Sequence, residues 1–291
     1  MSASHNAPDN TIAFQGLPGA YSHLACRAVY PVMTALPCAQ FEDAFAAVTE
    51  GRAKLGMIPV DNSVAGRVAD IHHLLPDSGL WIIGEHFQRV NHHLLAIKGA
   101  TMATVRRVET HIHALGQCRN FLRAHNFAPI VAADTAGAAK DIATRGDVSV
   151  AAIASELAAE IYGLQSLAAN IEDADHNTTR FLIMAREAAV TDPNGGPYVT
   201  SFLFRVRNVP SALYKAMGGF ATNGVNMTKL ESYMVGGHFS ATQFYAEVDG
   251  HPDQKALKLA FEELNFYSKE VRMLGTYPAH PFRFEAANQA E

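Results

Sequence analysis

The first 164 residues repeat one theme: a short apolar segment typical of a strand, a polar turn, and then a helical pattern. The strand segments are 11–16, 54–60, 106–110, 129–133 and 148–153, and Gly163 is expected to cap the last helix. Strands that alternate with helices predict a mainly parallel α/β sheet. In such sheets ligands bind beyond the carboxyl ends of the strands.

Polar side chains follow these strands at the end where a ligand is expected. The turns contribute Ser22, Asp61, Asn62, Ser63, Thr110, Asp134 and Thr135. From this placement we expect Ser22, Asp61, Thr110 and Thr135 to contact a substrate. The segment 171–186 differs, because its polar residues precede a strand at 180–185. We infer that the chain crosses to a second sheet and returns, which brings this loop to the same cleft.

A linker and a second domain follow. Residues 187–198 are rich in Pro and Gly between periodic segments, which is typical of a linker, and we expect few contacts to cross it. Beyond it the order is strand, helix, strand, strand, helix, strand, with a turn at Gly236-Gly237. The six segments are 199–207, 211–223, 225–235, 238–250, 251–268 and 271–279. This βαββαβ order predicts a ferredoxin-like domain.

Composition argues against several classes of protein. A net charge of -5 and a pI of about 6.3 are unlike those of a nucleic-acid binder. No apolar run reaches the ~18 residues that a membrane span needs, and residues 1–10 lack a secretion signal. The three cysteines form no C-x-x-C motif, so we expect a reduced, cytoplasmic protein. The histidines lack the partners of a metal site, so we expect no metal.

The motifs offer hydrogen-bond donors rather than a nucleophile. GLPGAYS (16–22) suits either an anion or an ordinary turn. DNSVAGR (61–67) places an acid, an amide and a hydroxyl at an expected helix start; one would cap the helix, which suggests that Asn62 faces the cleft. The expected cleft is poor in nucleophile–base pairs. Such a site holds an anionic substrate and does not suggest a covalent intermediate.

These residues resemble a known family, prephenate dehydratase of phenylalanine biosynthesis, from Ile12 to about Phe284. The matching segments are GLPGAYSHLA (16–25), IPVDNSVAGRV (58–68), DTAGAA (134–139), AAIASELAAEIYGL (151–164) and, most specifically, NTTRF (177–181). Residues 208–232 resemble the ACT domain, the family's phenylalanine sensor. Residues 110–113 read Thr-His-Ile-His where Ser-His-Pro-Gln is usual, Asp61 replaces Glu, and Tyr233-Met234 replaces Arg-Pro.

The resemblance implies a fold and domain bounds. It implies an α/β catalytic domain of two lobes, like a type II periplasmic binding protein, and a ferredoxin-like ACT domain. We expect the catalytic domain at 11–187, with lobes at 11–88 plus 167–187 and at 89–166. The linker would be 188–198 and the ACT domain 199–278.

The resemblance also implies a reaction: prephenate loses water and carbon dioxide to give phenylpyruvate, without a cofactor. Thr179 would assist the departing hydroxide, and Asn62, Ser63 and Gln117 would orient the substrate. Arg180 is expected to face a carboxylate. Phenylalanine would inhibit by binding between the ACT domains of a homodimer or homotetramer. The expected effector contacts are Ser211, Ala212, Leu213, Asn226 and Met227.

Strand geometry separates the two threonines. Neighbouring side chains of a strand alternate in direction, so Thr178 and Thr179 cannot both face the cleft. The Thr-Arg-Phe match selects Thr179, and alternation then turns Arg180 away unless the loop twists. Two alternatives stay open: an arogenate dehydratase, whose substrate carries an amine, and a non-catalytic amino-acid sensor. The intact NTTRF and DNS motifs weigh against the sensor.

Overall fold

The computed structural model describes residues 7–68, 71–234 and 241–287. The chain divides into two compact units, one made of 1–75 and 86–182, the other of 76–85 and 183–291. Within the described ranges, no helix is long and apolar enough to cross a membrane.

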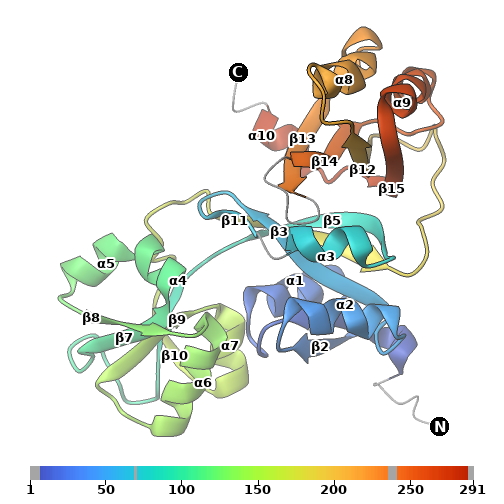
Figure 1. Ribbon diagram of the computed structural model, residues 1–291. Helices are drawn as coiled ribbons and strands as arrows, with labels where there is room; N and C mark the ends of the chain where they lie inside the picture. The colour runs from blue at the N-terminus through green and yellow to red at the C-terminus, as the bar shows by residue number, and fades with distance from the viewer. Residues whose placement is uncertain (1–6, 69–70, 235–240, 288–291) are drawn as a thin grey trace. The chain divides into compact units, whose positions relative to one another are not determined.

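The first sheet has the strand order β2-β1-β3-β11-β5, with β4 paired to β3 (Figure 1). β1 runs parallel to both β2 and β3. The apolar run of β3 is buried from Leu55 to Val60, as is typical of a strand covered on both faces. The elements are β1 (Thr11–Gln15), α1 (Tyr21–Val29), β2 (Thr34–Cys38), α2 (Phe41–Thr49), β3 (Leu55–Asn62), β4 (Gly66–Arg67), α3 (Ile71–Leu74), β5 (Trp81–Arg89) and β11 (Thr178–Ala185).

The second sheet has the order β10-β6-β9-β7-β8. Its strands and helices are β6 (His93–Ala96), β7 (Arg107–His111), α4 (Ile112–Gln117), α5 (Arg119–Ala124), β8 (Ala128–Ala132), α6 (Thr135–Arg145), β9 (Val150–Ala154), α7 (Glu156–Tyr162) and β10 (Gln165–Ala169). β9 is buried on both faces: Ala151 and Ile153 join one apolar cluster, and Val150 and Ala152 join another. The predicted cap Gly163 is confirmed, since it ends α7 in the left-handed region at φ 68°.

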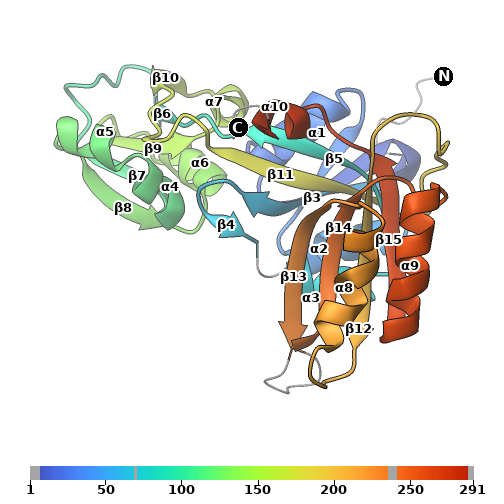
Figure 2. The same cartoon turned by 90° about the horizontal axis from the view of Figure 1, so that it is seen from above.

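The second unit contains the predicted βαββαβ domain. Its elements are β12 (Tyr198–Val206), α8 (Ala212–Thr222), β13 (Met227–Met234), β14 (Ala241–Asp249), α9 (Lys255–Tyr267) and β15 (Ser268–Pro278), followed by α10 (Phe282–Ala287). The antiparallel strand order is β13-β14-β12-β15, and α8 and α9 lie on one face of the sheet (Figure 2). The predicted ferredoxin-like order is confirmed. The predicted turn at Gly236-Gly237 lies outside the described residues.

The two helices of this domain cross closely at Gly219. A Cβ on Gly219 would lie 2.8 Å from the Glu263 Cβ and 3.0 Å from the Ala260 carbonyl oxygen. Such distances leave no room for a side chain. Gly219 therefore sets how near α8 can approach α9 above the shared apolar cluster.

Two local predictions are wrong. Asp61 and Asn62 do not start a helix: they end β3, and the chain turns back into β4 before α3 begins at Ile71. The turn is stable because Asn62 accepts backbone hydrogen bonds of the next residues, as an Asn in a turn often does.

The second wrong prediction is that few contacts would cross the 187–198 linker. Residues beyond it contact the segment 76–85, which belongs to the same compact unit. Arg283 bonds both oxygens of Glu85 at 2.6 and 2.8 Å and reaches Glu247 at 3.0 Å. The Arg272 guanidinium donates to the Pro76 carbonyl oxygen. These buried polar contacts tie the sheet of β12–β15 to the start of β5.

Candidate active site

The end of β3 meets the start of β11. The Ser63 backbone N–H donates to the Thr178 carbonyl oxygen at 2.9 Å, and the Thr178 N–H donates to Ser63 Oγ at 2.9 Å. The Ser63 hydroxyl donates to the His176 carbonyl oxygen at 2.8 Å. Ser63 therefore fastens the polar loop of 171–177 beside the DNS turn, although the two segments are over a hundred residues apart in sequence.

Asn62 is the centre of the polar cluster formed there. Its Oδ1 accepts the backbone N–H groups of Val64 and Ala65 at 3.0 and 2.7 Å. Its Nδ2 donates to the Thr179 hydroxyl oxygen at 3.0 Å and to Asn177 Oδ1 at 2.9 Å. Asn62 thus holds Thr179 as an acceptor. Among the described residues, none accepts a hydrogen bond from the Thr179 hydroxyl.

Gln117 joins this cluster from the end of α4. Its Oε1 lies 3.0 Å from Asn177 Nδ2 and 2.8 Å from His92 Nε2. His92 Nδ1 in turn lies 2.8 Å from the Tyr21 hydroxyl of α1. The side chains form one continuous chain of hydrogen bonds that starts at Tyr21 in the first lobe, passes through His92 and Gln117 of the second, and ends at Thr179 in the first.

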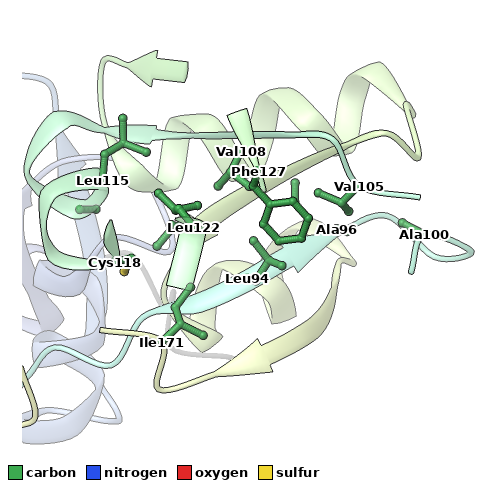
Figure 3. Packing of buried hydrophobic residues seen from close by; sticks show 13 residues of the cluster. Leu94, Ala96, Ala100, Val105, Val108, Leu115, Cys118, Leu122, Phe127 and Ile171 are labelled. Carbon is green, nitrogen blue, oxygen red and sulfur yellow. The ribbon is translucent and has the colours of Figure 1, made fainter. Parts of the chain in front are cut away.

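A cluster of buried apolar side chains (Figure 3) includes residues of α4 and α5 and supports the second-lobe residues of the hydrogen-bond chain. Leu94, Leu115, Cys118 and Ile171 are all buried in it. Each lies one or two residues from a polar residue of the site. The packing therefore fixes the backbone from which His92, Gln117 and the acidic loop project.

A pocket of ≈ 290 Å³ adjoins the hydrogen-bond chain. Its lining is Val64, Ala65, Ile112, His113, Gly116, Gln117, Glu172, Asp173, Ala174 and Asn177. The two carboxylates in it accept hydrogen bonds from the backbone. Glu172 accepts from the His92 backbone N–H at 2.8 Å, and Asp173 accepts from the Asn120 backbone N–H at 3.1 Å. Among the described residues, none accepts a hydrogen bond from the Gln117 amide nitrogen, whose side chain lines this pocket.

Burial determines the protonation states of the side chains in and beside the hydrogen-bond chain. It lowers the pKa of His92 from the ordinary value, which keeps the imidazole neutral, although hydrogen bonding to Gln117 opposes the shift. Burial also raises the pKa of Tyr21 well above its ordinary value and raises that of the Cys118 thiol. Tyr21 and Cys118 are therefore protonated near neutral pH. The cluster is made of neutral donors and acceptors.

The structure places Thr178 and Thr179 differently. β11 begins at Thr178, two residues before the predicted start. The Thr179 hydroxyl faces Asn62, whereas Arg180 faces the other side, 3.8 Å from Asp61 and over the Phe87 ring at 5.9 Å. Arg180 and Asp61 thus contact each other, and a contact of either with a substrate stays a prediction.

Three further predicted residues lie outside the hydrogen-bond chain. Thr110 is fully buried and donates to the Ile153 carbonyl oxygen at 2.6 Å. Ser22 is buried in the first turn of α1, and Thr135 begins α6 behind its cap Asp134. Their contact with a substrate stays a prediction.

The glycine loop between β1 and α1 packs against the second lobe. Gly19 has φ +92°, and a Cβ there would lie 2.8 Å from the Ala158 Cα. The Gly19 carbonyl oxygen accepts the Ser155 hydroxyl at 2.5 Å. Tyr162 donates to the Pro18 carbonyl oxygen at 2.7 Å. These contacts favour the turn interpretation of GLPGAYS over anion binding.

Sequence reasoning missed Tyr21 and His92. The adjacent histidines point in different directions: His92 is 2% exposed, whereas His93 is half-buried and bonds Ser166. The pair His92-His93 before an apolar strand was a signal that one histidine would be buried. Within the described residues, no group of three or more His, Cys, Asp or Glu side chains is placed to hold a metal ion.

The expected effector residues lie on the two loops that flank α8. Ser211 precedes this helix with φ +64°, and Ala212 and Leu213 begin it. Asn226 donates to Asp249 Oδ2 at 2.8 Å, and Met227 begins β13. Their binding of an effector stays a prediction.

Comparisons with known proteins found similar sequences and a matching family model. The family model described as prephenate dehydratase matches residues 12–189. The chain is 54% identical over 275 residues to a bifunctional N-acyl-homoserine lactone acylase/prephenate dehydratase of Komagataeibacter europaeus, covering 94% of this chain and 98% of that protein. It is 36% identical over 276 residues to arogenate dehydratase/prephenate dehydratase 2 of Arabidopsis thaliana, covering 92% of this chain and 72% of that protein.

A solved structure is also similar. Prephenate dehydratase from Arthrobacter aurescens, in complex with L-Phe, matches with a TM-score of 0.84 and 29% identity. The match covers 96% of this chain and 97% of that chain. The predicted fold class, a two-lobed α/β domain with a ferredoxin-like domain, is confirmed.

Proposed function

Because the chain belongs to the prephenate dehydratase family, whose members are decarboxylating hydro-lyases, we propose that it converts prephenate to phenylpyruvate. One observation carries the assignment of roles. Asn62 donates to the Thr179 oxygen, which leaves the Thr179 hydrogen for the departing hydroxyl of the substrate. Gln117 lines the adjoining pocket, and its amide nitrogen supplies further donors.

The reaction needs few groups beyond these hydrogen-bond donors. The bond from the ring to its carboxylate breaks, and its electron pair enters the ring as carbon dioxide leaves. The ring becomes aromatic as the bond to the hydroxyl breaks, and the hydroxide takes up one proton to become water. A hydrogen bond from Thr179 stabilises the negative charge that builds on this oxygen, and such assistance is worth about 10²–10⁴-fold. The hydrogen bond that the Thr179 oxygen accepts from Asn62 draws electron density from it and makes the Thr179 O–H a better donor.

A neutral set of donors suits a doubly charged substrate. Asn62, Gln117 and Thr179 orient prephenate without adding a free carboxylate that would repel it. Ser63 shapes the site by holding the 176–178 backbone. We place the catalytic domain at 11–187, the linker at 188–198 and the ACT domain at 199–278.

Turnover of pure prephenate, followed by the absorbance of phenylpyruvate, tests this function. We expect turnover by the wild-type chain and its loss in Thr179→Ala, which also excludes a contaminating enzyme. The same assay with arogenate decides between the two substrates, since dual names occur among relatives. A folded wild-type chain that turns over neither substrate would refute the proposal.

We further propose that phenylalanine binds the ACT domain of a homodimer or homotetramer and inhibits. Support comes from the L-Phe complex of the similar Arthrobacter protein and from the loops that carry Ser211 and Asn226. Coupling of ~1–3 kcal/mol is typical of allostery. Saturating phenylalanine should raise the melting temperature and lower turnover, with D-phenylalanine as control. If it changes neither, the ACT domain is not a phenylalanine sensor.

A second candidate function is hydrolysis of N-acyl-homoserine lactones. The observation that favours it is the 54% identity, over 98% of its length, to a protein named as an acylase as well as a dehydratase. The exposed side chains of Val64 and Ile112 give the pocket an apolar border on which an acyl chain could lie. Mass spectrometry should detect free homoserine lactone after incubation. If Thr179→Ala retains this release, the two activities use different groups; if none is released by the wild type, this second function is wrong.

A further inference from the structure

The hydrogen-bond chain of the site has only one consistent direction. Its fixed point is Asn62, whose Oδ1 accepts two backbone N–H groups, those of Val64 and Ala65. A backbone N–H can only donate, so the side-chain amide of Asn62 cannot be reversed. Its Nδ2 must therefore face Asn177 and Thr179, and it donates one hydrogen to each.

This direction passes on along the chain. Since Asn62 donates, Asn177 must present its Oδ1, and its Nδ2 must face Gln117. Two amide nitrogens would repel each other there, so Gln117 must present Oε1. The same oxygen faces His92 Nε2 at 2.8 Å, so this nitrogen carries a hydrogen. The Gln117 amide nitrogen is then turned to the pocket.

His92 and Tyr21 form the far end. A neutral imidazole carries one hydrogen, so with Nε2 protonated its Nδ1 is an acceptor. The Tyr21 hydroxyl, 2.8 Å from Nδ1, is the donor. The Asn91 carbonyl oxygen lies 2.9 Å from the same hydroxyl and also accepts from it, so the two acceptors share the one Tyr21 hydrogen. The hydrogen on Nε2 leaves Nδ1 of the neutral ring without one, which keeps Nδ1 an acceptor. The rings of Tyr21 and His92 also pack edge to face, with centroids 5.5 Å apart.

We propose that Tyr21 and His92 are positioning residues that lock the Gln117 amide with its oxygen inward and its nitrogen toward the substrate. Without the Nε2–H of the His92 ring, Gln117 Oε1 loses one of its two hydrogen-bond donors. Rotation of the Gln117 amide is then opposed by Asn177 alone. A rotated Gln117 would present an oxygen to the anionic substrate. The roles in catalysis rest on the proposed function, whereas the direction of the hydrogen bonds does not.

The direction is tested by the tautomer of His92. A long-range ¹H–¹⁵N spectrum of ¹⁵N-labelled full-length protein, with His92→Gln to assign the signal, reports which ring nitrogen carries the hydrogen. We expect Nε2–H at neutral pH. The Nδ1–H tautomer would overturn the proposal, whether or not the chain has dehydratase activity.

The positioning role is tested by two amides that differ in reach. In His92→Gln the amide nitrogen falls near the former Nε2 and can donate to Gln117; in His92→Asn it falls short, near the former Nδ1. Displacement of a substrate-orienting group costs on the order of 10²-fold, so we expect such a loss of kcat in His92→Asn, with most activity kept in His92→Gln. His93→Asn, outside the chain, should match the wild type.

These outcomes distinguish the possible failures. A purely structural role would lower the melting temperature of both His92 variants and would give no recovery in His92→Gln. Equal losses of kcat in two folded variants would therefore overturn the positioning role. A wild type that shows the Nε2–H tautomer and no turnover of prephenate would refute the proposed function and leave the hydrogen-bond direction supported.

Discussion

Replacing Gln117 by Glu tests which end of its side chain meets the substrate. The variant keeps the shape and keeps an oxygen to accept from His92 and Asn177, so it should fold with a nearly unchanged melting temperature. It puts a negative charge where the amide nitrogen faced the pocket. Two like charges about 4 Å apart repel by ~4 kcal/mol at an effective dielectric constant of ~20.

That repulsion predicts the size of the effect. Since ~1.4 kcal/mol is tenfold, kcat/KM for prephenate should fall by about 10³-fold. The measurement is the initial rate of phenylpyruvate formation across substrate concentration, with Gln88→Glu on β5 as a control of equal charge outside this pocket. Activity of Gln117→Glu should recover at lower pH, as the carboxyl gains a proton. A folded Gln117→Glu enzyme within about threefold of wild-type kcat/KM would refute the orientation of Gln117.

Three further predictions concern stability. Gly219→Ala should lower the free energy of unfolding by about 1–3 kcal/mol, because it overpacks α8 against α9. Gly218→Ala, which has open space beside it, should be neutral or stabilising. Chemical denaturation measures both variants, and equal effects would contradict the prediction. Arg283→Ala should cost about 3–5 kcal/mol, because it leaves two buried carboxylates without their shared guanidinium; an unchanged melting temperature would contradict this. The pKa of His92 is lowered in the folded state, so the unfolded chain binds its proton first as pH falls, and stability is lost as pH drops below ~6.5. Urea titrations of wild type and His92→Gln should show a difference in unfolding free energy that shrinks in this range, and a difference that grows would show the opposite sign.

The sequence predicted the parts of the fold that local signals determine. The βαββαβ domain and most strand–turn–helix units follow from periodicity and from Gly and Pro between elements. β2, β4, β5, β6 and β10 escaped prediction. β5 lacks regular alternation and contains Gly84, and β10 is short and half-exposed, so both depend on their partners in the sheet.

The sequence also predicted part of the site, namely the residues that local motifs identify. Thr179 and Asn62 were chosen from motifs, and the structure brings them within 3.0 Å although they are 117 positions apart. Nothing local to His92 shows that it will be buried against Gln117. Its place depends on the packing of the second lobe and on Tyr21 from the first.

The turnover number of Thr179→Ala is the most direct test of the central claim. The hydroxyl accepts one hydrogen bond from Asn62, so its loss should cost only ~1 kcal/mol of stability. The loss of its donated hydrogen bond should lower kcat for prephenate by about two to four decades. Thr179→Ser should keep much of the activity. Thr178→Ala should keep nearly all of it, because Thr178 makes its hydrogen bonds to Ser63 through its backbone. A soluble, normally melting Thr179→Ala enzyme with near wild-type kcat would contradict the account.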